Sequence, residues 1–238
     1  MSALRSKALI ASLAGLVLLT GCASTVQGAA VKTPASRAER ALPSADAVGQ
    51  AMHLPMQIDA PPLVGGTEIL RDDRGTSTPP ECVAVTHAGD RNTYRDAPLR
   101  SAAKGTWKTP KDTVAGTNAV VYVLELDSPD SAQSWYTKLA ARWQPCNGTT
   151  VTQRMESLSF TQNISQIADS GGTLTADLLV TTGDGAISPM RNRRALTSSG
   201  QYLIDVEVVD SLSGGTDSTT TNTASAVAKL VAGLVPER

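Results

Sequence analysis

Aromatic residues, histidine and net charge are all scarce in this chain of 238 residues. It holds one phenylalanine, four tyrosines and three tryptophans, so the core has to come mainly from Val, Leu, Ile and Ala. The formal net charge of −1 argues against a nucleic-acid partner, which would require a basic surface. A zinc site needs several ligands at suitable spacing. The two histidines, His53 and His87, are therefore interpreted as a helix-end residue and an ordinary packing or surface residue.

The motifs of common catalytic sites are also missing. No G-x-S-x-G sequence is present, which would mark a nucleophilic serine on a strand-to-helix turn. Gly65-Gly66 and Gly214-Gly215 lack the neighbours that a phosphate-binding loop requires. We therefore expect a protein that is not an enzyme and that carries no metal and no cofactor.

The N-terminus holds the most specific pattern. Arg5 and Lys7 precede a mostly apolar run over residues 8–19, which is typical of a secretory signal and short for a membrane-spanning helix. The run closes on Leu19-Thr20-Gly21-Cys22, which resembles the lipobox of bacterial lipoproteins. That resemblance implies a signal peptide over residues 1–21 and acyl chains such as palmitate on Cys22, with the protein anchored in the cell membrane, facing the cell envelope. An ordinary secretory peptide and an N-terminal membrane helix are the alternatives.

Assigning Cys22 to lipid changes the cysteine count. Removing residues 1–21 takes Arg5 and Lys7 away and shifts the formal net charge from −1 to −3. Cys82 and Cys146 then remain, and an oxidising compartment favours a disulfide between them. Two buried free thiols are the alternative.

The remaining chain divides into a tether and a domain. Residues 22–41 are interpreted as a flexible tether and residues 42–238 as one extracytoplasmic domain. Ser44 is expected to cap a helix that ends near His53. Residues 55–81 contain the pairs Pro61-Pro62 and Pro79-Pro80, and are interpreted as a long turn-rich connection without a regular element.

The second part of the domain shows strand patterns around one well-marked helix. Residues 113–127 carry the clearest strand signal, and Ser128, Pro129 and Asp130 then predict the start of a helix that ends before Pro145. Residues 149–155, 158–167, 172–182, 191–198 and 201–209 are predicted strands, and Thr223 begins a last helix. Short turns between these strands favour antiparallel pairing. The predicted fold class is α+β, with a mainly antiparallel sheet and helices packed on one face.

Two groups of charged residues lie in this domain. Asp72 and Asp73 lie between Arg71 and Arg74, as expected of a solvated loop. Arg191, Arg193 and Arg194 are predicted to lie on a strand, where alternate side chains face solvent. A solvated face is the preferred interpretation for these arginines, and an anion-binding face is the alternative.

Three segments follow one another along the domain: Pro79-Pro80-Glu81-Cys82, Trp143-Gln144-Pro145-Cys146-Asn147-Gly148 and Tyr202-Leu203-Ile204-Asp205-Val206. Together they resemble one family, that of the mycobacterial PknH-type extracellular sensor domain. The resemblance covers residues 42–235. It implies a mixed α/β domain with a large cleft for an unidentified ligand, found both as the sensor part of a receptor serine/threonine kinase and as a stand-alone lipoprotein.

The sequence departs from that family in two respects. We expect no kinase and no transmembrane helix in the mature domain. The sequence also lacks the second cysteine pair that family members commonly carry, since the corresponding regions read Asn192-Arg193-Arg194-Ala195 and Glu207-Val208-Val209. We expect a membrane-anchored module that binds or senses a small molecule. The alternative is a non-enzymatic interaction module that regulates an exported partner protein of the envelope.

Overall fold

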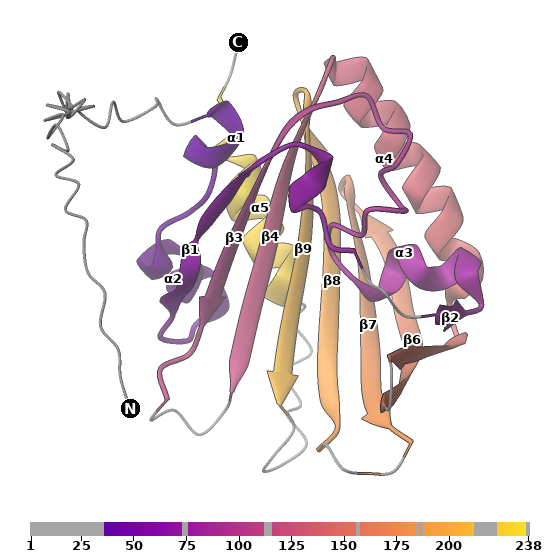
Figure 1. The fold of residues 1–238 in the computed structure, drawn as a ribbon. Helices are drawn as coiled ribbons and strands as arrows, with labels where there is room; N and C mark the ends of the chain where they lie inside the picture. The colour runs from indigo at the N-terminus through magenta and orange to yellow at the C-terminus, as the bar shows by residue number, and fades with distance from the viewer. Residues whose placement is uncertain are drawn as a thin grey trace, which may run out of the picture. The chain divides into compact units, whose positions relative to one another are not determined.

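A single nine-stranded antiparallel sheet forms the centre of the domain (Figure 1). The computed structural model describes residues 36–72, 76–111, 116–155, 158–183, 185, 188–211 and 223–236. Its strand order is β1-β3-β4-β9-β8-β7-β6-β5-β2. The strands are β1 (Gln57–Gly65), β2 (Thr76–Thr78), β3 (Leu99–Lys108), β4 (Thr117–Leu126), β5 (Thr150–Met155), β6 (Leu158–Ser170), β7 (Thr173–Thr182), β8 (Met190–Ser199) and β9 (Tyr202–Ser211).

The predicted strands of the second half, β5 to β9, are confirmed. Each pairs antiparallel with the next along the chain, because turns this short leave no length for a crossover. β9 then pairs with β4, which joins this run of strands to β3 and β1. The predicted class, an α+β domain with a mainly antiparallel sheet, is confirmed.

The helices cover both faces of the sheet, whereas the sequence led us to expect one. α1 (Arg37–Arg40), α2 (Ala45–Met52) and α5 (Thr223–Ala232) pack on one face, and α3 (Val83–Thr86) and α4 (Pro129–Trp143) on the other. In β4, Val121 and Val123 belong to the hydrophobic core beneath α1, α2 and α5, and Tyr122 and Leu124 belong to the core beneath α3 and α4. A strand buried on both faces reads as a continuous apolar run, which is the pattern that β4 shows.

The folded unit begins before Leu42, where the tether was predicted to end. Ser36 caps α1: its hydroxyl accepts a hydrogen bond from the Glu39 backbone N–H, and the Glu39 carboxylate accepts one from the Ser36 N–H. This reciprocal arrangement is a capping box, and Ala38 and Ala41 are fully buried. Residues 36–41 are therefore part of the domain, while the predicted signal peptide and Cys22 lie outside the described residues.

Three further strands were missed: β1, β2 and β3. β1 contains Pro61 and Pro62, which led us to expect turns, but among the described strands β1 lies at an edge of the sheet and pairs only with β3. Proline is tolerated at an edge because one side of the strand needs no hydrogen-bond donors. The register of β1 shifts on both sides of Ala60, which accommodates the two prolines.

The helix predicted after Ser128 is α4, and the predicted disulfide lies just beyond its end. Ser128 accepts a hydrogen bond from the Ser131 N–H at 3.1 Å, as an N-cap does. Cys146 ends a short 3₁₀ turn (Gln144–Cys146), and Cys82 ends another (Pro80–Cys82). The Cys82–Cys146 disulfide is present, as predicted, and it ties α3 to α4. No helix among the described residues is long and apolar enough to cross a membrane.

Candidate functional site

Four buried polar side chains lie side by side on the sheet face that α3 and α4 cover. Asn192 and Arg194 project from β8, and Asp205 and Glu207 from β9. Each is at least 95% buried, and Arg194 is fully buried. Burying charges is costly unless they are paired and hydrogen-bonded. These four groups therefore need ion-pair or hydrogen-bond partners within the domain.

Arg194 has a partner for each nitrogen of its guanidinium. Nε donates to the Val206 carbonyl at 3.1 Å, Nη1 donates to the Val85 carbonyl of α3 at 3.0 Å, and Nη2 forms an ion pair with Asp205. The indole ring of Trp143 lies 5.3 Å from the guanidinium carbon, within the range of a cation–π contact. Arg194 therefore connects the sheet to both α3 and α4.

Asp205 accepts hydrogen bonds from a segment far away in the sequence. Its Oδ2 accepts from the Gly89 N–H at 2.8 Å and from the Tyr94 hydroxyl at 2.8 Å. Burial raises the pKa of Asp205, although the charge of Arg194 and these donors act in the opposite direction. Burial raises the pKa of Tyr94 well above its usual value, and the negative charge of Asp205 raises it further. Tyr94 therefore stays protonated, and its hydroxyl donates the hydrogen bond to Asp205.

Glu207 hydrogen-bonds to the backbone of Ala88, the residue before Gly89. Its Oε2 accepts from the Ala88 N–H at 2.8 Å, and its Oε1 accepts from Asn192 Nδ2 at 3.1 Å. Burial alone would raise the pKa of Glu207, but hydrogen bonding and charge from His87, with the charges of Arg194 and Arg71, outweigh it and hold the pKa at about 2. Glu207 is therefore ionised over the whole range in which the protein would function.

His87 bridges this cluster to the far strands. Its Nδ1 lies 3.6 Å from Glu207 Oε1, and its Nε2 lies 3.1 Å from Gln153 Oε1 on β5. Gln162 on β6 donates to Gln153 Oε1 at 3.4 Å. His87 is buried, so of the two predicted roles it has the packing role, within a polar network. Among the described residues, no group of three or more His, Cys, Asp and Glu side chains is placed to hold a metal.

These contacts hold residues 87–94, called the docked segment below, against the sheet. Gly89 has a φ of +67°, and a Cβ there would lie 2.4 Å from the Tyr122 ring. Glycine is thus required both by backbone conformation and by the close approach to β4. At its other side, the segment pairs with Arg71, whose N–H donates to the Gly89 carbonyl and whose carbonyl accepts from the Arg91 N–H, both at 2.8 Å.

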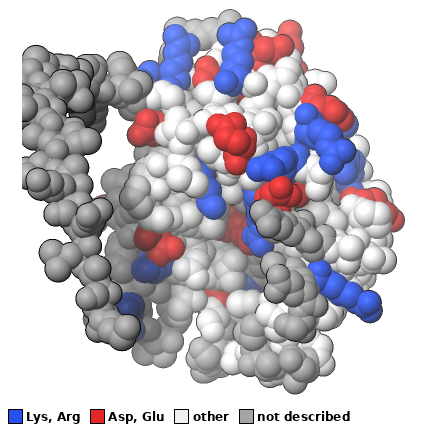
Figure 2. All heavy atoms as spheres, viewed as in Figure 1, with Lys and Arg blue, Asp and Glu red and all other residues white. Residues whose placement is uncertain are grey.

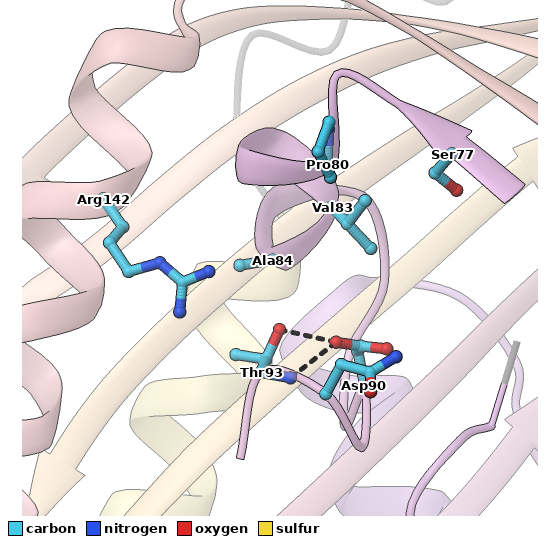
Figure 3. Close-up of a pocket in the computed structure, with 8 residues that line it drawn as sticks. Ser77, Pro80, Val83, Ala84, Asp90, Thr93 and Arg142 are labelled. Atoms are coloured by element: carbon cyan, nitrogen blue, oxygen red, sulfur yellow. Dashed lines mark hydrogen bonds between the residues drawn. The ribbon is translucent and has the colours of Figure 1, made fainter. Parts of the chain in front are cut away.

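A pocket of about 280 Å³ opens on the outer side of the docked segment (Figure 3). Pro80, Val83 and Ala84 form an apolar wall. Arg142 extends from α4 toward the loop that carries Asp90 and Thr93. Asp90 Oδ2 accepts from the Thr93 N–H at 2.7 Å and from its hydroxyl at 2.6 Å. The remaining lining residues are Ser77 and Asn92.

Comparison with known proteins agrees with this architecture. The family model of the PknH-like extracellular domain matches residues 33–233. The chain belongs to the PknH-like extracellular domain family. The crystal structure of the extracellular domain of PknH from Mycobacterium tuberculosis superposes with a TM-score of 0.69 at 18% identity, covering 85% of this chain and 97% of that one. This likeness supports the same fold.

A second solved structure is more distant from this PknH-like extracellular domain. A putative uncharacterized protein from Mycobacterium smegmatis, an Rv0999 ortholog, has a TM-score of 0.42 at 10% identity, with 80% of this chain and 96% of that one covered. No curated protein matches the chain in sequence. The family assignment, an extracellular domain, fits an extracytoplasmic location for residues 36–236.

The structure corrects the interpretation of the charged residues in this PknH-like domain. Arg193 and Arg194 were interpreted as a solvated face, but they are 98% and 100% buried, and Arg193 forms an ion pair with Asp210. Arg71 was placed in a solvated loop, yet its side chain is only 37% exposed and its Nη1 lies 3.9 Å from Glu207. Asp73 and Arg74 lie outside the described residues. The other predicted histidine, His53, ends α2 as its C-cap, as expected.

Sequence reasoning missed the roles of Asp205 and Glu207. Both alternate with buried apolar residues along β9, and that alternation usually marks the solvated face of a strand. The signal that points to burial is the pair of basic residues in the adjacent strand, of which Arg194 faces Glu207 in register. The two regions without the family's second cysteine pair, residues 192–195 and 207–209, lie on the neighbouring strands β8 and β9. In this chain a hydrogen bond from Asn192 to Glu207 connects them.

Proposed function

We propose that this chain is a cell-envelope lipoprotein whose extracytoplasmic domain binds a small polar ligand in the pocket beside the docked segment. The anchoring part rests on the Leu19-Thr20-Gly21-Cys22 sequence and on membership in an extracellular domain family. Lipid on Cys22 would hold the domain at the outer side of the cell membrane. The PknH structure offers the analogy of a sensor, and fold alone does not assign that role.

The observation that carries the binding proposal is a preorganised pocket with two chemically different sides. Pro80, Val83 and Ala84 offer apolar contact, while Asn92 and Arg142 offer hydrogen-bond donors. The docked segment is already held by buried hydrogen bonds to Asp205 and Glu207, and the disulfide holds α3 and α4 together. A preformed site binds without the cost of ordering its loops. The volume suits a ligand smaller than most drug-sized molecules.

Anchoring is tested by replacing Cys22 in cells. The wild-type protein should incorporate labelled palmitate and partition into the detergent phase, whereas Cys22→Ala should do neither. A Cys22→Ala protein that still carries label would refute lipid attachment at this residue.

Ligand binding is tested by thermal shift of the full chain, purified in a neutral detergent, against a panel of small polar envelope metabolites. A ligand that raises the melting temperature of the wild type should lose that effect in Arg142→Ala and in Asn92→Ala. Arg154→Ala, an exposed arginine of β5 outside the pocket, is the matched control. A ligand that stabilises all four proteins equally would bind elsewhere.

A second candidate function is docking of an envelope protein on β1, because apolar side chains on this strand are exposed. Ile58, Leu63 and Val64 are 58%, 51% and 42% exposed, and β1 is an edge strand. Exposed apolar residues on an edge strand can mark an interaction surface. Crosslinking in cells should give a defined partner that is lost in Leu63→Glu and kept in Arg142→Ala, and the reverse result would favour the pocket.

A further inference from the structure

The pocket beside the docked segment carries one acidic and one basic side chain that do not pair with each other. Asp90 and Arg142 both line it, and neither forms an ion pair with any group among the described residues. Figure 3 shows the Arg142 guanidinium and the Asp90 carboxylate on different sides of Thr93. Opposite charges in one pocket attract each other, so something in the fold keeps these two apart.

Asp90 is held in place by its own backbone and side-chain bonds. The residues on either side bond to one strand segment: the Gly89 carbonyl accepts from the Arg71 N–H, and the Arg91 N–H donates to the Arg71 carbonyl. Asp90 Oδ2 accepts both from the Thr93 N–H and from the Thr93 hydroxyl. Turning this carboxylate toward the cation would break the two bonds to Thr93.

The second carboxylate oxygen of Asp90 is left for a ligand. Among the described residues, no hydrogen bond reaches Oδ1, and Oδ1 is not one of the unpartnered atoms that are sealed inside the protein. The residue as a whole is only 2% exposed, so this oxygen reaches the pocket from a buried position. Because a buried charge without a full set of donors is costly, a ligand ammonium at Oδ1 would be stabilising.

Arg142 provides the opposite end of the pocket. It lies in the last turn of α4, and its guanidinium can offer paired donors to a carboxylate or phosphate. Asn92 adds donors, because its Oδ1 accepts a hydrogen bond from Arg95, which leaves the N–H groups of its Nδ2 for a ligand. The pocket therefore presents an acceptor at one side and donors at the other.

The rest of the pocket suits a short, uncharged spacer between two charged groups. Pro80, Val83 and Ala84 line it with apolar atoms, and its volume is about 280 Å³. Figure 2 shows acidic and basic side chains interspersed on the side of the molecule that carries α3. A surface of mixed sign does not attract a strongly charged ligand from a distance, which favours a molecule without net charge.

We propose that this pocket binds a small zwitterion, with its ammonium group at Asp90 and its carboxylate or phosphate group at Arg142. The assignment rests on the pocket being a ligand site, as proposed above, and adds the chemical class of the ligand. A free amino acid and the phosphoethanolamine head of a lipid both carry this pair of charges.

Calorimetric titration of the full chain in a neutral detergent, at constant ionic strength, tests the class with matched probes. Alanine carries both charges, propionate lacks the ammonium, and alaninamide lacks the carboxylate. We expect alanine or phosphoethanolamine to bind about tenfold or more tightly than propionate and alaninamide. The tighter of the two zwitterions identifies the source, an amino acid or a lipid headgroup. Propionate or alaninamide binding as tightly as both zwitterions would overturn the proposal.

The same titration separates this proposal from the proposed function. If no zwitterion binds, while another compound of the metabolite panel stabilises the wild type and not Arg142→Ala, the ligand class is wrong and the pocket remains a ligand site. If no compound of either set binds at the pocket, the ligand site itself is refuted.

Variants assign the two charges to their residues. Asp90→Asn keeps an oxygen that can accept from Thr93 and removes the charge, so it should weaken zwitterion binding about tenfold and leave propionate binding unchanged. Arg142→Gln should weaken both. Asp96→Asn, on an exposed residue outside the pocket lining, is the matched control. Melting curves verify that each variant is folded. Unchanged zwitterion binding in Asp90→Asn, or an equal loss in Asp96→Asn, would contradict the role of Asp90.

Discussion

Arg194 of β8 and Asp205 of β9 form an ion pair in which both side chains are almost completely buried. Each also bonds to the segment that covers the sheet: Arg194 to the Val85 carbonyl, and Asp205 to the Gly89 N–H and the Tyr94 hydroxyl. The pair therefore holds α3 and the docked segment in place. The pocket proposed as the ligand site is built from those same elements.

Removing one partner of this pair should be costly. Arg194→Met leaves the Asp205 carboxylate buried without its cation, and we expect a loss of about 3–5 kcal/mol in the free energy of unfolding. Urea denaturation measures it, with Arg154→Met, on an exposed residue of β5, as the control. The double variant Arg194→Met with Asp205→Asn should recover part of the loss. Equal losses of stability in Arg194→Met and in the control Arg154→Met would contradict this role.

Glu207 should make the domain sensitive to acid. Its pKa is about 2 in the folded state and ordinary in the unfolded chain, so its contribution is complete above about pH 4.5 and is lost as the pH falls toward 2. The contribution is on the order of 3 kcal/mol. Denaturation curves should show that Glu207→Gln loses less stability than the wild type between about pH 5 and pH 2. Glu81→Gln, on an exposed residue, should follow the wild type.

Two glycines separate backbone strain from steric contact. Gly89→Ala places a Cβ 2.4 Å from the Tyr122 ring at a φ of +67°, whereas Gly200→Ala places one at a φ of +53° with nothing within 4 Å. Both should lose about 1 kcal/mol from the left-handed backbone, and Gly89→Ala about 1–3 kcal/mol more from overpacking. Thermal denaturation compares them. If the two variants melt together, the contact between Gly89 and Tyr122 contributes nothing.

The disulfide should stabilise both the fold and the pocket. Cys82 and Cys146 are 64 residues apart, and closing a loop of that length contributes up to roughly 4 kcal/mol. The double variant Cys82→Ala with Cys146→Ala should unfold at lower urea concentration and exchange its α3 amide hydrogens faster. A reducing agent should shift the wild type toward this variant and leave the variant itself unchanged. A reductant effect on the variant would point to another cause.

Local patterns were enough where an element carries its own signals. Ser128 and Pro129 mark the start of α4 in the sequence, and Ser44 marks α2, because a cap satisfies backbone groups a few residues away. The capping box of Ser36 and Glu39 was also present in the sequence. It was missed because residues 23–41, among which it lies, show little hydrophobic periodicity. The capping box explains why the predicted tether was too long.

β1 and β3, the first two strands at one edge of the sheet, are extended because of their neighbours and not because of a local pattern. The Pro61-Pro62 pair favours a turn when the sequence is taken alone, and only pairing with β3 on one side makes an extended strand acceptable there. β3 itself has a weak pattern, with Ala102 and Ala103 facing opposite cores. Small side chains give little periodicity, so this strand is defined by β4 on one side and β1 on the other.

The sequence by itself determined the antiparallel run of strands, the main helices and the pairing of Cys82 with Cys146, because those depend on local periodicity, caps and cysteine count. Only the tertiary structure decided that Arg194, Asp205 and Glu207 are buried rather than solvated. Alternation along a strand shows which side chains share a face, but not what covers that face. The cover here is a segment from elsewhere in the chain: Gly89 and Asp205, whose hydrogen bond closes the site, are 116 residues apart.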